Sequence, residues 1–268
     1  MRFVKWDDGK QHLMVSQLGF GCGRLFGGLE KRRASRLLEC AYELGIRHFD
    51  TAPAYGHGQS ENVLGEVFAG VADITITTKV GLPRPVGAPS LASVARRLML
   101  RRVLSYAPAL KRRLLAGTQA SAPAAAAQPP RVLERDVVLR ALDDSLKRLR
   151  RDHVHFYCVH EPDQYVIDDA LLSVFDDLKA SGRISAHGLA WGRAAPTAPR
   201  GWDVIQAQYI PRSPRDGRLR FFHGVLRSSQ SDGPTQLAAA MREERDAVFI
   251  ASASERHQLA DLARRVGD

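Results

Sequence analysis

The sequence predicts an α/β fold, a (β/α)8 TIM barrel with an N-terminal β-hairpin and a long basic insertion after the third strand. Apolar runs too short for helices alternate with longer segments of helical period over most of the 268 residues. Several of these runs end in a polar residue, as strands do at the ligand-binding end of a barrel. The eight predicted barrel strands are residues 18–21, 46–49, 74–80, 154–160, 184–190, 204–209, 219–225 and 247–251.

The elements follow one another in barrel order. Two apolar runs, residues 3–6 and 12–15, flank a turn that contains Gly9, which predicts the hairpin before the first barrel strand. Apolar residues at helical spacing predict outer helices at residues 31–44, 60–68, 131–149, 167–181, 235–245 and 255–266. The linkers on both sides of residues 204–209 are rich in Pro, Arg and Gly, so we expect an incomplete ring of helices there.

Residues 83–130 are far longer than an ordinary βα connection. Residues 90–116 predict one or two helices, and the Ala/Pro/Gln stretch at 117–130 is expected to be flexible. We expect one domain, residues 1–268, with residues 84–130 as a basic, partly flexible insertion that serves as a substrate lid or partner-binding arm. A solvated helix with a mobile tail fits the same composition. No acid occurs between Asp73 and Glu134, whereas this range contains the cations Arg84, Arg96, Arg97, Arg101, Arg102, Lys111, Arg112, Arg113 and Arg131.

Composition narrows the class of protein. The sequence has no secretory leader and no run of 18 apolar residues, so we expect a cytoplasmic protein without a membrane span. Its three cysteines lie in apolar surroundings, which predicts buried free thiols. The net charge of +10 favours anionic ligands, but no nucleic-acid-binding signature accompanies it, so we expect no nucleic-acid partner.

A metal site is also not expected. His153 directly precedes the predicted strand 154–160, which contains His155, Cys158 and His160. Alternation along a strand sends the first two side chains to the face opposite the other two, so the four cannot converge on one ion.

The candidate active site begins between Gly45 and Glu61. Asp50 ends a predicted strand, and Tyr55 lies on the loop that follows it. Lys79 and His160 lie near or at the C-terminal ends of two later strands, so the four side chains are expected to meet at one end of the barrel. A neighbouring ammonium lowers the pKa of a tyrosine, ordinarily about 10, and an acid holds that ammonium in place. Each residue taken alone also has a structural interpretation: Asp50 as the cap of a helix, and Tyr55 as an ordinary half-buried aromatic residue.

The set, with its surroundings, resembles the aldo-keto reductase family. The stretches that carry this resemblance are 18–28 (LGFGCGRLFGG), 49–66 (FDTAPAYGHGQSENVLGE), 77–81 (TTKVG), 145–163 (SLKRLRRDHVHFYCVHEPD), 181–189 (SGRISAHGL) and 205–209 (IQAQY). The resemblance implies that Tyr55 donates a proton, that Lys79 and Asp50 support it, and that His160 orients a substrate carbonyl. It also implies that reduced nicotinamide supplies hydride, without a metal.

The same resemblance assigns cofactor contacts. It places Gly21, Cys22 and Gly23 beside the nicotinamide and Gln206 on the carboxamide. It places the adenosine 2′-phosphate, and thus NADP(H) rather than NAD(H), on Ser252, Ser254, Arg256 and Gln258. The chain departs from the family where Ala190-Trp191 replace a Ser-Asn pair, where Ser252 replaces Gly or Lys, and where Leu262 replaces Asn.

The expected function is interconversion of a carbonyl compound, sugar-like or anionic, and its alcohol. Two alternatives share the barrel. One is a non-catalytic NADP(H)-binding sensor or scaffold that resembles potassium-channel β-subunits. The other is an aldolase that forms a Schiff base through Lys79.

Overall fold

The computed structural model describes residues 1–25, 30–85, 129–212, 215–228 and 232–267. The chain divides into two compact units, residues 1–84 with 131–268 and residues 85–130. The helices and the flexible stretch predicted for the insertion lie almost entirely in residues 86–128, outside the described part of the chain.

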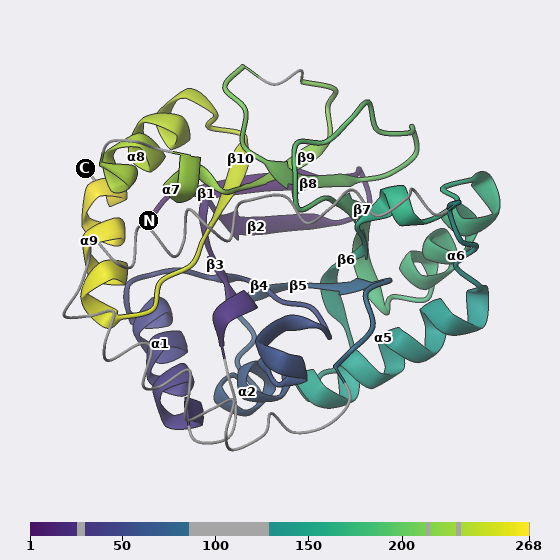
Figure 1. Ribbon diagram of the computed structural model, residues 1–268, viewed down its shortest axis with the longest axis horizontal. Coiled ribbons are helices and arrows are strands. Elements are labelled where there is room, and N and C mark those ends of the chain that lie inside the picture. Colours follow the sequence, from purple (N-terminus) through teal and green to yellow (C-terminus); the bar gives the residue numbers. More distant parts are fainter. Residues whose placement is uncertain (26–29, 86–128, 213–214, 229–231, 268) are drawn as a thin grey trace. The chain divides into compact units, whose positions relative to one another are not determined.

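Parallel strands close into a barrel, which confirms the predicted (β/α)8 fold (Figure 1). Most of these strands are buried on both faces, as parallel strands covered by helices are. The last strand pairs with the first, with Phe249 opposite Leu18. The strands are β3 (Leu18–Gly21), β4 (His48–Asp50), β5 (Thr75–Val80), β6 (Val154–His160), β7 (Ile184–Ala190), β8 (Val204–Gln208), β9 (Leu219–His223) and β10 (Ala247–Ala251).

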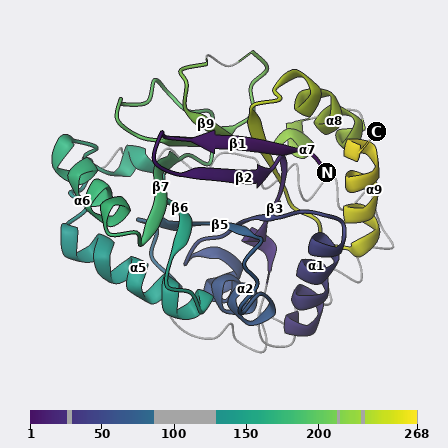
Figure 2. The same ribbon diagram turned by 180° about the vertical axis from the view of Figure 1, so that it is seen from behind.

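Helices surround the strands (Figures 1 and 2). Their apolar stripes face inward, as in the first helix, where Leu38 and Ala41 are fully buried. The linkers before and after β8 contain no helix among their described residues, so the ring is incomplete there, as expected. No described helix is long and apolar enough to cross a membrane. The helices are α1 (Lys31–Glu43), α2 (Ser60–Val67), α5 (Arg135–Leu149), α6 (Asp169–Ala180), α7 (Val225–Ser228), α8 (Gly233–Glu243) and α9 (Arg256–Gly267).

A two-stranded antiparallel sheet precedes the barrel. It consists of β1 (Phe3–Asp7) and β2 (His12–Ser16) and lies in front of the barrel strands in Figure 2. The Trp6 ring meets the Phe156 ring edge to face at 6.3 Å, and Val4 and Val15 join the same apolar cluster. This cluster fills the interior near the starts of the strands, so the two-stranded sheet closes the N-terminal end of the barrel. The C-terminal end is the one that remains for a ligand.

An ion cluster ties the turn of this sheet to the barrel. Lys179 Nζ lies 2.8 Å from Asp8 and 2.9 Å from Asp203. Burial opposes ionisation of Asp8, but hydrogen bonds from Lys179 and from the Gln11 and Lys10 amides outweigh it and lower its pKa from 3.8 to about 2. The cluster therefore stabilises the fold only while Asp8 is ionised.

We expect Asp8→Asn to lower the free energy of unfolding by on the order of 1 kcal/mol at pH 6, because solvent screens an ion pair near the surface. The folded pKa lies below the unfolded one, so this contribution is present above pH 3.8 and is lost as the pH falls toward 2. Urea unfolding of both proteins at pH 6 and pH 3 measures it. A difference between the two proteins that does not shrink at pH 3 would contradict the assignment.

Candidate active site

The four predicted side chains meet at the C-terminal end of the barrel. Asp50 is the last residue of β4, Lys79 the penultimate residue of β5 and His160 the last residue of β6. Tyr55 begins the short 3-10 helix Tyr55–Gly58 in the loop after β4. All four line a cavity of about 640 Å³. The four side chains lie close together because neighbouring parallel strands end side by side in a barrel.

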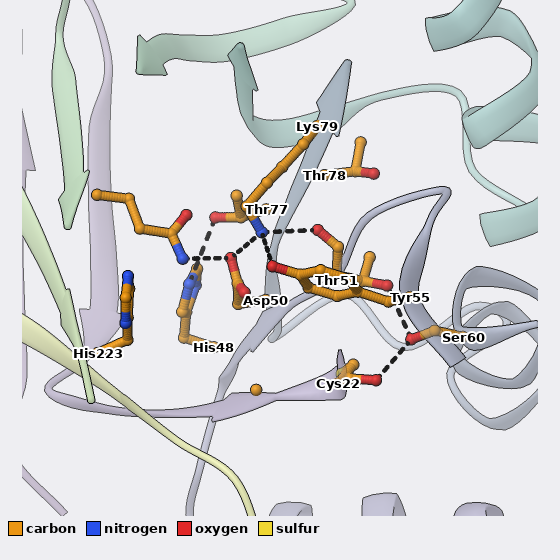
Figure 3. A network of polar contacts seen from close by, with 12 residues as sticks. Cys22, His48, Asp50, Thr51, Tyr55, Ser60, Thr77, Thr78, Lys79 and His223 are labelled. Atoms are coloured by element: carbon orange, nitrogen blue, oxygen red, sulfur yellow. Dashed lines mark hydrogen bonds and ion pairs between the residues drawn. The ribbon is translucent and has the colours of Figure 1, made fainter. Parts of the chain in front are cut away.

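Lys79 is the centre of a buried polar network (Figure 3). Its Nζ donates to Asp50 Oδ1 at 2.7 Å, to the Thr51 carbonyl at 3.0 Å and to the Tyr55 hydroxyl at 3.3 Å. The three donors of an ammonium are thereby all used. Gln206 Nε2 donates to the same Asp50 oxygen at 3.0 Å. The network fixes the tyrosine hydroxyl beside a positive charge.

A tight loop places the tyrosine. Gly56, directly after it, has a φ of 57°, and a Cβ there would lie 1.7 Å from the Leu25 carbonyl oxygen, so only glycine fits. The Ser60 hydroxyl ties the loop down, since it lies 2.9 Å from the Thr51 hydroxyl and donates to the Cys22 carbonyl at 3.1 Å. The ring of Tyr55 then meets His160 edge to face, with centroids 5.6 Å apart.

The protonation states differ in part from expectation. Burial raises the pKa of Tyr55 above its ordinary value, and although Lys79 lowers it, burial is the larger effect. The lowering of this pKa that the sequence predicted from Lys79 is present, but it is smaller than the effect of burial. Burial also opposes the charge on Lys79, but Asp50 and Tyr55 raise its pKa above the ordinary value, so it is an ammonium. Burial and then Lys79 lower the pKa of His160 to about 3, so its ring is neutral near pH 7.

The residues expected to hold a nicotinamide cofactor fall into two groups. Gly21, Gly23, Gln206 and Ser252 line the cavity with the four residues above. The Ser252 hydroxyl donates to the Gly21 carbonyl at 2.9 Å. The Gln206 carbonyl oxygen Oε1 is buried and has no hydrogen-bond partner among the described residues, an uncommon state for an amide and one that a ligand donor would relieve.

The other expected contacts lie off the cavity wall. The Cys22 side chain is fully buried, and burial raises the pKa of its thiol. Cys40 and Cys158 are likewise buried and free, as predicted. Gln258 Oε1 accepts from the Ser254 amide at 3.0 Å near the start of α9. The exposed Arg256 forms an ion pair with Glu43 at 3.5 Å.

Sequence reasoning missed two polar residues of the cavity wall. His223 ends β9, and the rule that found Asp50 and His160 would have found it, but the predicted strand ran on to residue 225. Glu161 directly follows His160 and has a left-handed φ of 54°. Trp191, which replaces an expected asparagine, is buried in the wall and donates from Nε1 to Asp163 at 3.0 Å.

Within the described ranges, no three His, Cys, Asp or Glu side chains are placed to bind a metal ion together. The rings of His153 and His155 do lie close together, with centroids 4.6 Å apart. The Ile76 amide donates to His155 Nδ1 at 3.3 Å, so this imidazole is hydrogen-bonded to the backbone of the neighbouring strand β5.

Comparison with known proteins gives a consistent match. The model of the aldo/keto reductase family matches residues 17–211. D-threo-aldose 1-dehydrogenase of a Pseudomonas species is 29% identical over 188 residues, which cover 66% of this chain and 50% of that protein. A probable voltage-gated potassium channel subunit beta from Oryza sativa is 25% identical and covers 73% of this chain and 48% of its own length. The chain thus spans about half the length of the curated relatives it matches.

Solved structures match along the whole chain. Aldo-keto reductase AKR11C1 from Bacillus halodurans superposes with a TM-score of 0.67 at 21% identity, covering 100% of this chain and 92% of its own. Glycerol dehydrogenase AKR11B4 from Gluconobacter oxydans superposes with a TM-score of 0.61 at 17% identity, covering 99% and 90%. At these identities the likeness establishes the fold.

Proposed function

This chain belongs to the aldo/keto reductase family, and from this premise we propose that it is an NAD(P)H-dependent oxidoreductase. It interconverts the carbonyl group of an aldehyde, ketone or sugar and the corresponding alcohol. One observation carries the proposal: Lys79 Nζ joins Asp50 and the Tyr55 hydroxyl in the wall of a cavity at the C-terminal end of the barrel. Relatives named as a dehydrogenase of an aldose and a reductase of 6-dehydroglucose support it.

The cavity wall fits a nicotinamide. The unpaired Gln206 Oε1 suits the N–H groups of a carboxamide, and glycines at positions 21 and 23 leave room for a flat ring. When bound, the reduced ring supplies hydride to the carbonyl carbon. We propose NADP(H) over NAD(H), with Arg256 near the adenosine phosphate. Comparing the Kd of NADPH and NADH for the wild type and for Arg256→Ala, by nicotinamide fluorescence, tests that preference.

The protein's own residues handle the proton. Tyr55 donates its hydroxyl proton to the carbonyl oxygen as that oxygen gains negative charge. Lys79, held as an ammonium by Asp50, stabilises the phenolate left behind. His160, neutral and edge-on to the tyrosine ring, donates an N–H to the same carbonyl oxygen and orients it. No metal ion has a role in this scheme.

The raised pKa of Tyr55 predicts that the two directions of the reaction depend differently on pH. Reduction needs the protonated phenol, which a raised pKa favours, so kcat for reduction should stay flat from pH 6 to pH 9. Alcohol oxidation needs the phenolate, so its kcat should rise steadily over that range. Steady-state assays in both directions at constant ionic strength measure this. A falling oxidation rate between pH 7 and pH 9 would contradict the assignment of Tyr55.

A second function merits the same test, because two curated relatives are named as probable potassium channel beta subunits. It is cofactor binding without turnover, as in a sensor or scaffold. Titration with NADPH and NADH, followed by a panel of aldehydes, ketones and aldoses monitored at 340 nm, separates the two. Binding with turnover supports the reductase, and binding without turnover of any of them supports the sensor. The Schiff-base alternative is disfavoured because Lys79 is an ammonium with three hydrogen bonds, whereas attack on a carbonyl needs a neutral amine.

A further inference from the structure

Glu161 adds a carboxylate to the wall of the cavity that also contains Tyr55 and His160. It directly follows His160, and its backbone N–H donates to the Ala190 carbonyl at 2.7 Å. Its φ of 54° is a conformation that side chains other than asparagine and aspartate rarely adopt. The turn sends the carboxylate into the cavity wall, where its charge contributes to raising the pKa of Tyr55. A strained acid at this place calls for a functional reason.

The carboxylate is held in position. Its Oε1 accepts the Gly192 N–H at 2.9 Å. A Cβ at Gly192 would come within 2.5 Å of that oxygen, so the absence of a side chain at position 192 lets the carboxylate approach the backbone. The clamp fixes one oxygen, and within the described residues no hydrogen bond holds the second.

No cation neutralises this acid in the described part of the wall. Glu161 forms no ion pair there, whereas its neighbour Asp163 is bound by Arg193 and by the Trp191 indole. The ammonium of Lys79 is committed to Asp50, 2.7 Å away. Among the described lining residues, the two carboxyl groups of Asp50 and Glu161 are accompanied by one ammonium, that of Lys79, although the protein as a whole carries +10.

We infer that Glu161 selects the substrate by charge. Its carboxylate accepts hydrogen bonds from the hydroxyl groups of a neutral polyhydroxylated carbonyl compound and repels one that carries a carboxylate or phosphate. A hydrogen bond to an ionised acceptor is stronger than one between neutral groups. A negative charge in the protein also repels a nearby negative charge on a ligand. Of the sugar-like and anionic substrates expected from the sequence, this favours the sugar-like. The inference rests on the proposed reductase function.

The test compares matched substrates that differ in charge. The pairs are D-glyceraldehyde with D-glyceraldehyde 3-phosphate, and D-glucose with D-glucuronate, and butanal serves as a reference without hydroxyls. Relative to wild type, Glu161→Gln should lower kcat/KM for the neutral polyols about tenfold and raise it for the anions about tenfold. The value for butanal should stay within about twofold. A neutral-to-anion ratio that does not change in Glu161→Gln would overturn the inference.

Two further variants separate selection from general damage. Gly192→Ala keeps the charge but pushes the carboxylate aside, so it should shift the ratio in the same direction by a smaller factor. Glu66→Gln removes one acid from outer helix α2, where it pairs with Lys31, and should leave the ratio unchanged. An equal shift in Glu66→Gln would show that net charge, not Glu161, governs the ratio.

A binding measurement keeps the inference independent of turnover. Trp191 lies buried in the cavity wall, so its fluorescence should report ligand binding. Wild type should bind D-glucose more tightly than D-glucuronate, and Glu161→Gln should reverse the order. If the protein reduces no carbonyl compound but this reversal occurs, the proposed function fails and the charge selection stands. If reduction occurs without either change, only the charge selection fails.

Discussion

Tyr55→Phe should lower kcat for carbonyl reduction by about 10³-fold, because it removes the proton donor. The variant keeps the ring, so its edge-to-face contact with His160 at 5.6 Å and its place 4.7 Å below Lys79 Nζ remain. The Kd of the cofactor should change by less than about threefold, because only substrate and transition state meet the hydroxyl. Steady-state assays and a fluorescence titration of the same preparation measure both.

Tyr157→Phe is the matched control. Tyr157 is a fully buried tyrosine on β6, and its hydroxyl donates to the Val138 carbonyl at 3.1 Å, away from the cavity. Loss of that bond should lower the free energy of unfolding by about 1 kcal/mol and leave kcat unchanged. Retained reduction in Tyr55→Phe, or an equal loss in Tyr157→Phe, would refute the role given to Tyr55.

Lys79→Met should combine loss of activity with loss of stability. The side chains of Lys79 and Asp50 are only 1% and 5% exposed, so the substitution leaves a buried carboxylate whose nearest remaining donor is Gln206. Breaking a buried pair from one side costs about 3–5 kcal/mol. The phenolate of Tyr55 also loses its neighbouring charge, so kcat should fall by at least about 10²-fold. Urea unfolding and single-turnover assays measure the two effects separately.

A double variant distinguishes charge from packing. Asp50→Asn with Lys79→Met removes both charges, so most of the stability should return while activity stays low. Arg148→Met is the control for a buried pair outside the cavity wall: Arg148 of α5 contacts the buried Glu61 of α2 at 2.7 Å. It should destabilise by a similar amount, yet its folded fraction should remain active. A double variant as unstable as Lys79→Met would show that the buried charge is not the cause.

Most of the barrel was predictable because its signals are local. Each strand is a short apolar run and each helix an apolar stripe, and both patterns are read from neighbouring residues. The positions of Asp50, Lys79 and His160 at strand ends follow from the same runs, and the closure of parallel strands then brings those ends together. Errors arose where a run continued past its strand, as at residues 219–225, where the sequence hid His223 at the end of β9.

The sequence by itself determined the barrel and the meeting of four side chains at one end of it, because short apolar runs along the chain mark the order of the strands and where each one ends. Tertiary structure decided their electrostatics. Gln206 reaches Asp50 across 156 residues, Gly192 clamps Glu161 across 31, and burial reverses the effect of Lys79 on the pKa of Tyr55. Ionisation energies depend on burial and on distances of a few ångströms between segments remote in sequence, and only the folded chain sets those distances.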